Sequence, residues 1–298
     1  MHIALLGGSG YVGSCFRNEF QRRGHQLSMV SRAACDFYAQ DQLRSLIDKL
    51  QPDYLVNSAG YTGKPNVDAC ELDKANCMAG NAVLPGIIGK VCQDLRLPWG
   101  HVSSGCIYTG SKPDGSGFTE TDPPNFSFRQ NNCSFYSGTK ALGEEILCDY
   151  PECHVWRLRI PFSHVASPRN YLSKVIKYDR LLDAENSLSN LQEFVDAAID
   201  CIDKELPYGI YNLTNPGSLT TRQVVDIMRD SGFTTKAFDF FDSEDEFMSI
   251  AAKTPRSNCV LDSSKAASLG LKLSPIEESV RTALEKWIPD QAQVQCGS

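Results

Sequence analysis

Runs of apolar residues alternate with segments of helical periodicity along the first half of the chain. Segments 11–24, 40–50, 75–95 and 134–150 place apolar residues at helical spacing. The apolar runs between them, each predicted as a strand, are residues 2–7, 25–32, 52–60, 97–108 and 154–162. Strands that are apolar throughout are buried on both faces. The pattern therefore predicts an α/β fold with a doubly wound parallel sheet between two helical layers.

The second half of the chain has a looser pattern. Helices are predicted near 170–178, 190–204, 220–231 and 275–287, with short strands such as GIYNLT between them. We expect one domain over residues 1–162 and a smaller substrate-binding lobe over residues 163–298, part of which returns to the sheet. The long polar loop 109–132, rich in Pro and Gly, is expected to take part in function.

Composition narrows the class of partner. The 298 residues carry 29 Lys and Arg against 36 Asp and Glu, a net charge of −7, which argues against general binding of nucleic acid or anionic membranes. No apolar run is as long as a membrane span, and the N-terminal residues are typical of a first strand and not of a signal peptide. The twelve cysteines are scattered without a CxxC pair, so we expect reduced thiols, a cytoplasmic location and no metal site.

A glycine-rich turn follows the first strand. Gly7, Gly10 and Gly13 have the spacing GxxGxxG and lead into a helix whose first residues are Tyr11 and Val12. Small residues let the backbone approach a pyrophosphate, which rests on the positive end of the helix dipole. The strand–turn–helix context therefore predicts a Rossmann-type dinucleotide site, and a glycine-rich turn without a ligand is the alternative.

The end of the second strand indicates which dinucleotide binds. A carboxylate usually receives the ribose 2′-hydroxyl of NAD here, whereas this chain has Ser31 and Arg32. A hydroxyl and a guanidinium suit a 2′-phosphate, so NADPH is the expected cofactor, unless Arg32 is only a solvated surface charge. The remaining cofactor contacts are expected from Asp36 and Phe37 at the adenine and from Ala59 and Gly60 after the third strand.

A tyrosine and a lysine share one face of the predicted helix 134–150. Tyr136 and Lys140 are four residues apart, and Ser104 ends the fourth strand upstream. A nearby ammonium favours phenolate and lowers the pKa of a tyrosine, which suits proton transfer near neutral pH. In carbonyl reduction Ser104 would bind the ketone oxygen, Tyr136 would protonate it and Lys140 would hold the nicotinamide ribose. A lone YxxxK is usually a solvated helix face, but its position after the fourth strand favours catalysis.

Together these residues resemble the extended short-chain dehydrogenase/reductases. Longer words resemble a narrower family, the nucleotide-rhamnose synthase epimerase/reductases, which are similar to the C-terminal part of plant-type UDP-rhamnose synthases: NSAGYTGKPNVDACE, GFTETDPPNF, FYSGTKALGEE, PRNYLSKVIKY and PRSNCVLD. The resemblance implies a bifunctional NADPH-dependent enzyme. It would epimerise UDP-4-keto-6-deoxy-D-glucose at C3 and C5 and reduce C4 to give UDP-L-rhamnose, after a separate 4,6-dehydratase has acted.

This chemistry gives Cys106 a purpose. Protons at C3 and C5 flank the C4 ketone, so their removal gives an enolate whose O4 the same Ser104 and Tyr136 can hold. Cys106 lies two residues after Ser104, and in an extended chain both side chains point to one side. We expect its thiol to act as acid or base if a nearby cation lowers its pKa, and the alternative is a small buried residue.

The other substrate residues follow mainly from the resemblance. Lys174 is implied as the partner of Cys106 on the opposite face of the sugar ring, with Lys177 and His164 as alternatives. Asn170 precedes Lys174 by four residues, so the two share a helix face toward the substrate. Arg256 is implied at the diphosphate, with a surface charge as the alternative. The remaining substrate contacts are expected from Thr62, Lys64, Asn66 and Gln192.

Two other functions stay open on the sequence alone. A 4-dehydrorhamnose reductase without epimerase activity would need no thiol at position 106. A non-catalytic NADP-binding regulatory subunit would not need Ser104, Tyr136 and Lys140 together. The choice between UDP and dTDP also stays open, since it rests on one methyl group worth ~1–3 kcal/mol, and a homodimer is one option for the oligomeric state.

Overall fold

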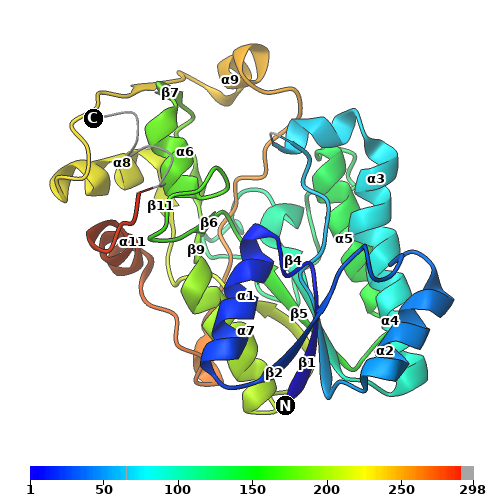
Figure 1. Ribbon diagram of the computed structural model, residues 1–298. Coiled ribbons are helices and arrows are strands. Elements are labelled where there is room, and N and C mark those ends of the chain that lie inside the picture. Colours follow the sequence, from blue (N-terminus) through cyan, green and yellow to red (C-terminus); the bar gives the residue numbers. More distant parts are fainter. Residues whose placement is uncertain (65, 290–298) are drawn as a thin grey trace.

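The centre of the molecule is a parallel sheet of six strands in the order β2–β1–β3–β4–β5–β10 (Figure 1). The structure is a computed structural model and describes residues 1–64 and 66–289. The order reverses between β1 and β3, and ligands bind at such a switch point, beyond the C-terminal strand ends. The predicted doubly wound sheet is confirmed. The strands are β1 His2–Leu6, β2 Gln26–Val30, β3 Tyr54–Asn57, β4 Trp99–Ser104, β5 Cys153–Leu158 and β10 Gly209–Asn212.

Helices cover both faces of the sheet because successive strand residues point to opposite sides. Ile3 and Leu5 of β1 pack with α1 and α7, whereas Ala4 and Leu6 pack with α2 and α4. Along the described part of the chain, every helix is too short or too polar to cross a membrane. The covering helices are α1 Tyr11–Arg22, α7 Leu191–Asp203, α2 Gln40–Leu50, α4 Leu84–Leu95 and, beside α4, α5 Phe135–Leu147.

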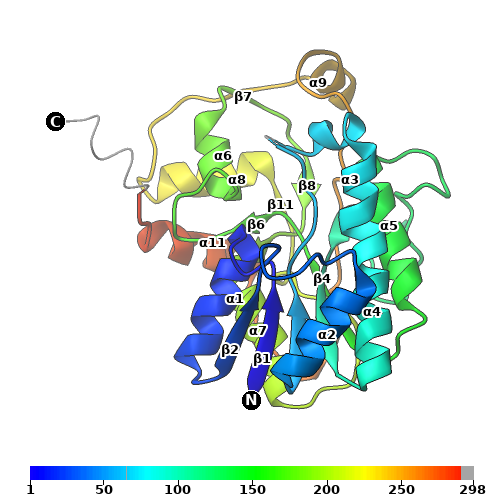
Figure 2. The same cartoon turned by 45° about the vertical axis from the view of Figure 1, so that its right-hand side comes forward.

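A smaller lobe with its own apolar core stands above the C-terminal ends of the strands (Figure 2). Polar caps begin three of its helices: Thr220 and Gln223 form a capping box at α8, Asn170 caps α6 and Ser243 caps α9. Its helices are α6 Tyr171–Lys177, α8 Thr221–Asp230, α9 Glu244–Ile250 and α11 Ile276–Glu285, and its short strands are β6 Pro161–Phe162, β7 Arg180–Leu181, β8 Glu185–Asn186, β9 Ser189–Asn190, β11 Leu219–Thr220 and β12 Asp239–Phe240.

Parts of the second half of the sequence also belong to the sheet and the helices that cover it. The helix α7 packs against the sheet, and β10 pairs with β5 at its edge. The short helix α10, Ser264–Ser268, lies beside β10. A division of the chain at residue 162 therefore stays a prediction.

The predicted helix 75–95 is interrupted. It consists of α3, Lys74–Met78, a π-helical turn, Ala79–Val83, and then α4. Asn81 in this turn is fully buried, and its side chain accepts a hydrogen bond from Tyr61 N at 2.9 Å and donates one to Tyr61 O at 2.8 Å. The turn thus ties the helix to the segment after β3, which apolar spacing alone could not indicate.

Two predicted strands end early, at the edge where the site lies. The strand predicted over 97–108 stops at Ser104, and the 3₁₀ turn Gly105–Ile107 follows. The strand predicted over 154–162 divides into β5 and β6, because Ile160 between them has a φ of 36°. A β-branched residue rarely adopts this left-handed backbone, and such residues cluster at functional sites.

Candidate active site

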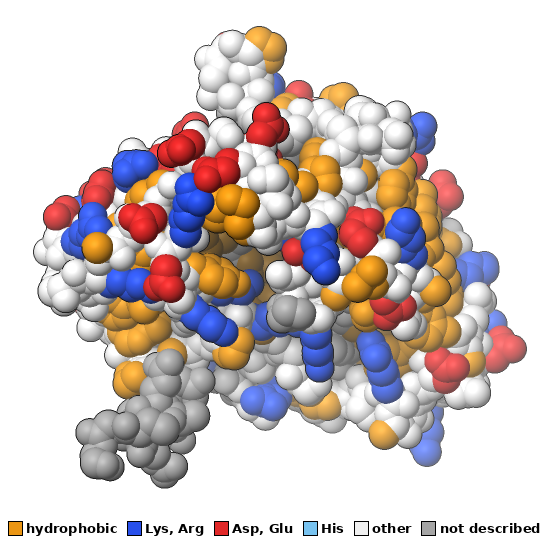
Figure 3. Space-filling model, turned by 90° about the horizontal axis from the view of Figure 1, so that it is seen from above, with side chains coloured by type: hydrophobic (Ala, Val, Ile, Leu, Met, Phe, Trp, Pro, Cys, Tyr) orange, Lys and Arg blue, Asp and Glu red, His pale blue; other side chains and the backbone are white. Residues whose placement is uncertain are grey.

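One large cavity lies between the sheet and the smaller lobe. It has a volume of about 890 Å³ and is lined by the turn after β1, the ends of β3 and β4, α5, α6 and the segment 255–258. Seen from above, this face of the molecule is hollowed, and Lys and Arg side chains lie near the hollow (Figure 3). The cavity is at the switch point of the sheet, where a ligand is expected.

The turn after β1 has the shape that a dinucleotide pyrophosphate requires. Gly7 has a φ of 75°, and a Cβ on it would lie 2.5 Å from Ala59 N. A Cβ on Gly13 would lie 2.1 Å from Gly7 O, so both positions admit only glycine. Gly10 caps α1 without a side-chain hydrogen bond, and the first turn of α1 carries no acidic residue. Its N–H groups are therefore free for an anion, which fits the predicted cofactor.

The other predicted cofactor residues divide into two groups. Those that line the cavity are Gly10, Tyr11, Val12, Ala59, Gly60 and Lys140. Ser31 and Arg32 are exposed after β2, and Asp36, also exposed, accepts a hydrogen bond from Tyr38 N at 3.0 Å. Phe37 is 3% exposed, and its ring belongs to the core under α2 and not to the cavity wall.

Ser104, Tyr136 and Lys140 line the same cavity, so the structure brings the three predicted catalytic residues together. Ser104 is the last residue of β4. The helix α5 begins after Ser134, whose hydroxyl accepts a hydrogen bond from Ser137 N at 3.1 Å. This cap fixes the turn that carries Tyr136.

The charges in this group are set by burial. Burial lowers the pKa of Lys140, whose Nζ donates to Val102 O at 3.3 Å. Burial, together with the nearby Cys106, raises the pKa of Tyr136 well above its ordinary value, and Ser104 offsets this only in part. The expected lowering of the Tyr136 pKa by Lys140 is wrong, because burial dominates. The phenol stays protonated, as a proton donor must be.

A buried ion pair holds α5 against the sheet one turn beyond Lys140. Glu144 accepts two hydrogen bonds from Arg157 Nε, at 3.1 Å, and one from Arg157 Nη2 at 2.7 Å. The hydroxyl of Ser103 donates to the same carboxylate at 2.5 Å. Both charged residues are more than nine-tenths buried. Removing either would leave a buried charge unpaired, so this pair fixes the register of the catalytic helix against β4 and β5.

Cys106 lines the cavity beside Ser104, but not by strand alternation. The prediction of an extended chain here is wrong, since Cys106 lies in the 3₁₀ turn and its N–H donates to Ser104 Oγ at 3.2 Å. Burial raises the pKa of the thiol, and a hydrogen bond with Ser104 and the charge of Arg159 lower it only in part. The thiol is therefore the resting form, and an expected net lowering by a cation is not found.

Lys174 reaches the same cavity from α6. It is half-buried, and burial, followed by the charge of Arg169, lowers the pKa of its amino group. The alternative Lys177 is exposed one turn further along, and neither it nor His164 is part of the cavity wall. Lys174, unlike both alternatives, therefore lines the same cavity as Cys106, and its role as the partner of Cys106 stays a prediction.

Two predicted substrate residues have protein partners instead. Asn170 is fully buried: its side chain accepts from Leu172 N at 3.0 Å and donates to the carbonyls of Ser163 and Val165, each at 2.8 Å. It caps α6 and so positions Lys174. Gln192 lies on α7 facing α1, outside the cavity wall, where it donates to Glu19 at 3.3 Å and Asp196 at 3.2 Å. A contact of either residue with substrate stays a prediction.

Arg256 lines the cavity and is held by the 3₁₀ turn η1, Val67–Glu71. Its Nη1 and Nη2 donate to the two carboxylate oxygens of Asp68 at 2.7 and 2.8 Å, which leaves further N–H groups for a phosphate. Glu71, at the end of the same turn, accepts from Phe135 N at 2.7 Å and from the Thr254 hydroxyl at 2.9 Å. The turn therefore joins the Arg256 segment to the start of α5.

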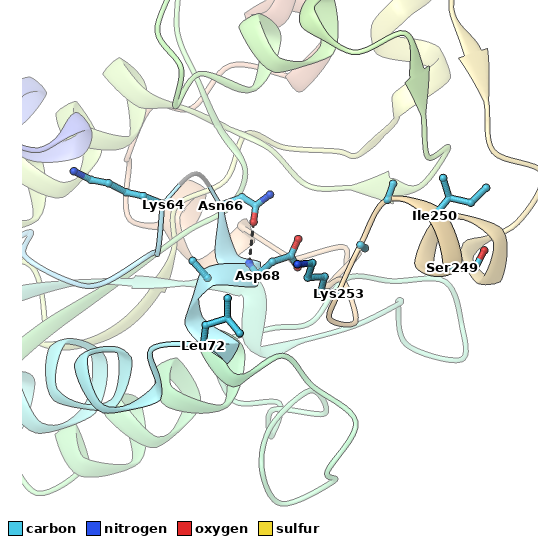
Figure 4. A pocket seen from close by; sticks show the side chains of 10 residues that line it. Lys64, Asn66, Asp68, Leu72, Ser249, Ile250 and Lys253 are labelled. Carbon is cyan, nitrogen blue, oxygen red and sulfur yellow. Dashed lines mark hydrogen bonds between the residues drawn. The ribbon is translucent and has the colours of Figure 1, made fainter.

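A second hollow of about 450 Å³ lies between η1 and the end of α9 (Figure 4). Lys64 lies here and not in the large cavity, whereas Asn66 lines both and accepts a hydrogen bond from Asp68 N at 2.9 Å. Thr62 lines the large cavity, and its hydroxyl accepts from Arg169 at 3.0 Å. Of the residues predicted after β3, Thr62 and Asn66 are thus placed with the catalytic group.

Several residues of the cavity wall were missed by sequence analysis. Arg159 directly follows β5 and exposes only 6% of its surface, and a charge at the end of an apolar strand was the available signal. Arg180 lies 4.3 Å from the centroid of the Phe241 ring and pairs with Glu246 at 2.7 Å. No sequence spacing connects these last three, because short strands and loops of the lobe bring them together. Others missed in the wall are Ser137, Arg169, Tyr171 and Phe247.

Comparison with known proteins decides the family. Residues 1–288 match the family described as RmlD substrate binding domain. The chain belongs to this family. It is 32% identical to the bifunctional dTDP-4-dehydrorhamnose 3,5-epimerase/dTDP-4-dehydrorhamnose reductase of Arabidopsis thaliana, over 94% of this chain and 91% of that protein. The relationship to rhamnose-forming epimerase/reductases predicted from the sequence words is confirmed.

Longer relatives and solved structures agree. A trifunctional UDP-glucose 4,6-dehydratase/UDP-4-keto-6-deoxy-D-glucose 3,5-epimerase/UDP-4-keto-L-rhamnose-reductase of Arabidopsis thaliana is 35% identical over 94% of this chain, which spans 41% of that protein. The fold matches the L780 UDP-rhamnose synthase of Acanthamoeba polyphaga mimivirus with a TM-score of 0.88 at 24% identity, covering 96% of this chain and 99% of that one. It also matches a dTDP-4-dehydrorhamnose reductase of Bacillus anthracis in complex with NADP, with a TM-score of 0.79 at 15% identity, over 96% and 98%.

Proposed function

We propose that this protein is an NADPH-dependent oxidoreductase of nucleotide-sugar metabolism that also acts as an epimerase, converting UDP-4-keto-6-deoxy-D-glucose to UDP-L-rhamnose. The observation that carries this proposal is that Cys106 and Lys174 line the same cavity as Ser104, Tyr136 and Lys140. The two Arabidopsis relatives, whose names include both activities, support it. UDP is proposed over dTDP because of the words shared with UDP-rhamnose synthases.

The cofactor would lie along the sheet edge. The glycine turn and the N-terminus of α1 would hold its pyrophosphate, and Lys140 would hold the nicotinamide ribose beside Tyr136. Ser31 and Arg32, exposed after β2, would meet the 2′-phosphate that distinguishes NADPH from NADH. When bound, NADPH supplies the hydride for C4. The NADP complex described for the Bacillus anthracis reductase is consistent with this choice.

Epimerisation would use the two faces of the sugar ring. Loss of a proton from C3 or C5 moves negative charge onto O4, where the hydroxyls of Ser104 and Tyr136 donate hydrogen bonds. In the glucose configuration the hydrogens at C3 and C5 lie on the same face of the ring. One group therefore takes the proton from either carbon and a second group returns a proton on the opposite face. Cys106, in the 3₁₀ turn after β4, and Lys174, on α6, line the cavity from different elements and would form this pair.

Reduction would follow in the same pocket. Ser104 keeps the O4 carbonyl polarised, and Tyr136 gives its phenolic proton to O4 as the hydride reaches C4. Lys140 then faces the phenolate, whose charge its ammonium offsets. The bound ketone need not leave between the two reactions, because both depend on the same hydrogen bonds to O4.

The nucleotide would extend toward the lobe. Arg256, fixed by Asp68, would bind the diphosphate, and Arg180 with the Phe241 ring would border the nucleoside. A 4-keto-6-deoxy substrate requires an earlier dehydration of a hexose nucleotide, so a separate 4,6-dehydratase would act before this chain. A homodimer stays a prediction.

The test uses purified protein with NADPH and UDP-4-keto-6-deoxy-D-glucose in the absence of any other epimerase, with the product identified by NMR. Formation of UDP-L-rhamnose supports the proposal. NADPH consumption only with the already epimerised ketone identifies a reductase without epimerase activity. No consumption with this ketone or with the epimerised one identifies a binding subunit. The dTDP ketone, assayed in parallel, decides the nucleotide.

A further inference from the structure

Arg159 is a buried cation that the steps described above leave unused. It follows β5, exposes 6% of its surface and lines the cavity together with Cys106. A Cβ placed on Gly105, the residue before Cys106, would lie 3.5 Å from Arg159 Cδ. The arginine side chain therefore packs directly against the turn that carries the thiol.

The hydrogen bonds of this guanidinium are incomplete. Its Nη2 donates to Asn186 Oδ1 at 2.5 Å and to the carbonyl of Ser257, both neutral acceptors. Its Nε is buried and has no hydrogen-bond partner among residues 1–64 and 66–289. The nearby Arg157 is neutralised by Glu144 at 2.7 Å, whereas no described carboxylate forms an ion pair with Arg159. Burying a cation that has an unpaired N–H donor costs free energy of folding. Its presence beside the cavity therefore points to an anion that forms there.

The surroundings of Cys106 identify that anion. The titratable or charged groups near the thiol are Tyr136 and Lys140 from α5, Cys133 from the loop before α5, Arg159 after β5, and Cys259, which packs in the same apolar cluster as Cys106; the hydroxyls of Ser104 and Ser137 are also near it. Only two of these carry positive charge. The ammonium of Lys140 is bonded to Val102 O, and Arg159 has the larger effect on the pKa of the thiol. Arg159 is thus the cation best placed to stabilise a negative charge on this sulfur.

We propose that Arg159 is the counter-ion of Cys106 and stabilises the thiolate through which this residue passes during epimerisation. In this step the thiolate is the base: a C–H bond of the sugar breaks, its electron pair moves into the enolate, and an S–H bond forms, whose proton is lost to solvent before the next cycle. A cation beside a cysteine favours its thiolate, and the second proton of the cycle comes from Lys174 or water. The role of the pair rests on the proposed function, whereas the pairing itself does not.

The pairing is tested without substrate. The alkylation rate of Cys106 by iodoacetamide is followed by peptide mass spectrometry as a function of pH. Arg159→Gln, which keeps an N–H donor without charge, and Arg159→Met should shift the midpoint of alkylation upward by about one pH unit or more. Arg159→Lys should keep the midpoint of the unsubstituted protein. Arg129→Met, which removes an exposed cation paired with Glu145, is the control and should not move it. If Arg159→Met does not fold, Arg159→Gln carries the same prediction, and equal midpoints with and without the charge overturn the proposal.

A second readout separates this proposal from the proposed function. Deuterium uptake at C3 and C5 should fall about tenfold or more at pH 7 in Arg159→Gln and recover as pH rises, since a higher thiol pKa needs a higher pH. A merely structural role would lower uptake equally at every pH, and that result overturns the counter-ion. If the unsubstituted protein incorporates no deuterium but the variants shift the alkylation midpoint, the proposed epimerase activity is wrong and the pairing of Arg159 with Cys106 is supported.

Discussion

Asp68 holds Arg256 by two N–H···O bonds, at 2.7 and 2.8 Å, between a turn on the sheet side of the cavity and a segment that comes from the smaller lobe. The guanidinium also lies 5.9 Å from the centroid of the Phe247 ring. An arginine oriented in advance loses less entropy when it binds a phosphate. We therefore predict that Asp68 positions Arg256 for the diphosphate.

Asp68→Asn should weaken binding of the nucleotide sugar more than it slows turnover. The amide keeps one hydrogen bond to Arg256 and loses the charge, so the guanidinium is held less firmly. We expect the KM for the nucleotide sugar to rise about tenfold, or ~1.4 kcal/mol, with a smaller change in kcat. Glu277→Gln, which weakens an exposed pair with Arg281 on α11, is the control. A KM equal to that of the control would contradict this role.

Tyr136→Phe should separate the two reactions. Without the phenol, O4 has no proton donor during hydride transfer, and NADPH oxidation should fall by ~10²–10⁴-fold. Exchange of the C3 and C5 protons should fall much less, because Ser104 still holds the enolate oxygen and Cys106 is untouched. Both rates are measured on one preparation, by absorbance and by NMR. Equal losses in the two rates would show that the reactions do not divide in this way.

Arg32→Ala tests the choice of cofactor. The exposed guanidinium after β2 is expected at the 2′-phosphate, so its removal should raise the KM for NADPH by about tenfold and leave that for NADH unchanged. Arg44→Ala, on the exposed side of α2, serves as the matched control. A variant that keeps its preference for NADPH would assign the 2′-phosphate to other residues.

Asp196→Asn should stabilise the protein at neutral and alkaline pH. Burial, and hydrogen bonding and repulsion with Glu19, raise the pKa of Asp196 from 3.8 to about 6. A raised pKa contributes stability below the unfolded value of 3.8 and loses it as pH rises through about 6, so the ionised form is the costly one. Asn imitates the protonated acid. Its Tm should exceed that of the unsubstituted protein at pH 8, and the difference should shrink toward pH 4. Asp226→Asn, at an exposed site, is the control.

The sheet and its cofactor edge could be predicted because they depend on local patterns. Alternating apolar and helical segments determine the layers, and the glycine spacing places Gly7 against Ala59 with no room for a side chain. Tyr136 and Lys140 share a helix face by their spacing alone. Two features of this region were not predicted, the positive φ of Ile160 and the π-helical turn around Asn81, because apolar periodicity does not record backbone conformation.

The far wall of the site could not be predicted because it depends on tertiary contacts. Arg159, Arg180 and Phe241 come from separate segments that meet only when the lobe folds over the strand ends. The predicted lowering of the Tyr136 pKa was wrong for a related reason. The sequence shows that Lys140 is near Tyr136, but burial, which outweighs that neighbour, is known only from the folded chain. Gln192 was predicted to contact substrate, but its side chain donates a hydrogen bond to Glu19.

We propose that one pocket exchanges carbon-bound protons through Cys106 and then reduces the same ketone. It is tested most directly by turnover of UDP-4-keto-6-deoxy-D-glucose with NADPH in deuterium oxide, comparing the unsubstituted protein with Cys106→Ala and with Cys148→Ala, an exposed cysteine, as the control. We expect deuterium at both C3 and C5 with the unsubstituted protein and the control, and at neither carbon with Cys106→Ala, which still reduces the epimerised ketone. Normal labelling by Cys106→Ala, or a product without label from the unsubstituted protein, would contradict it.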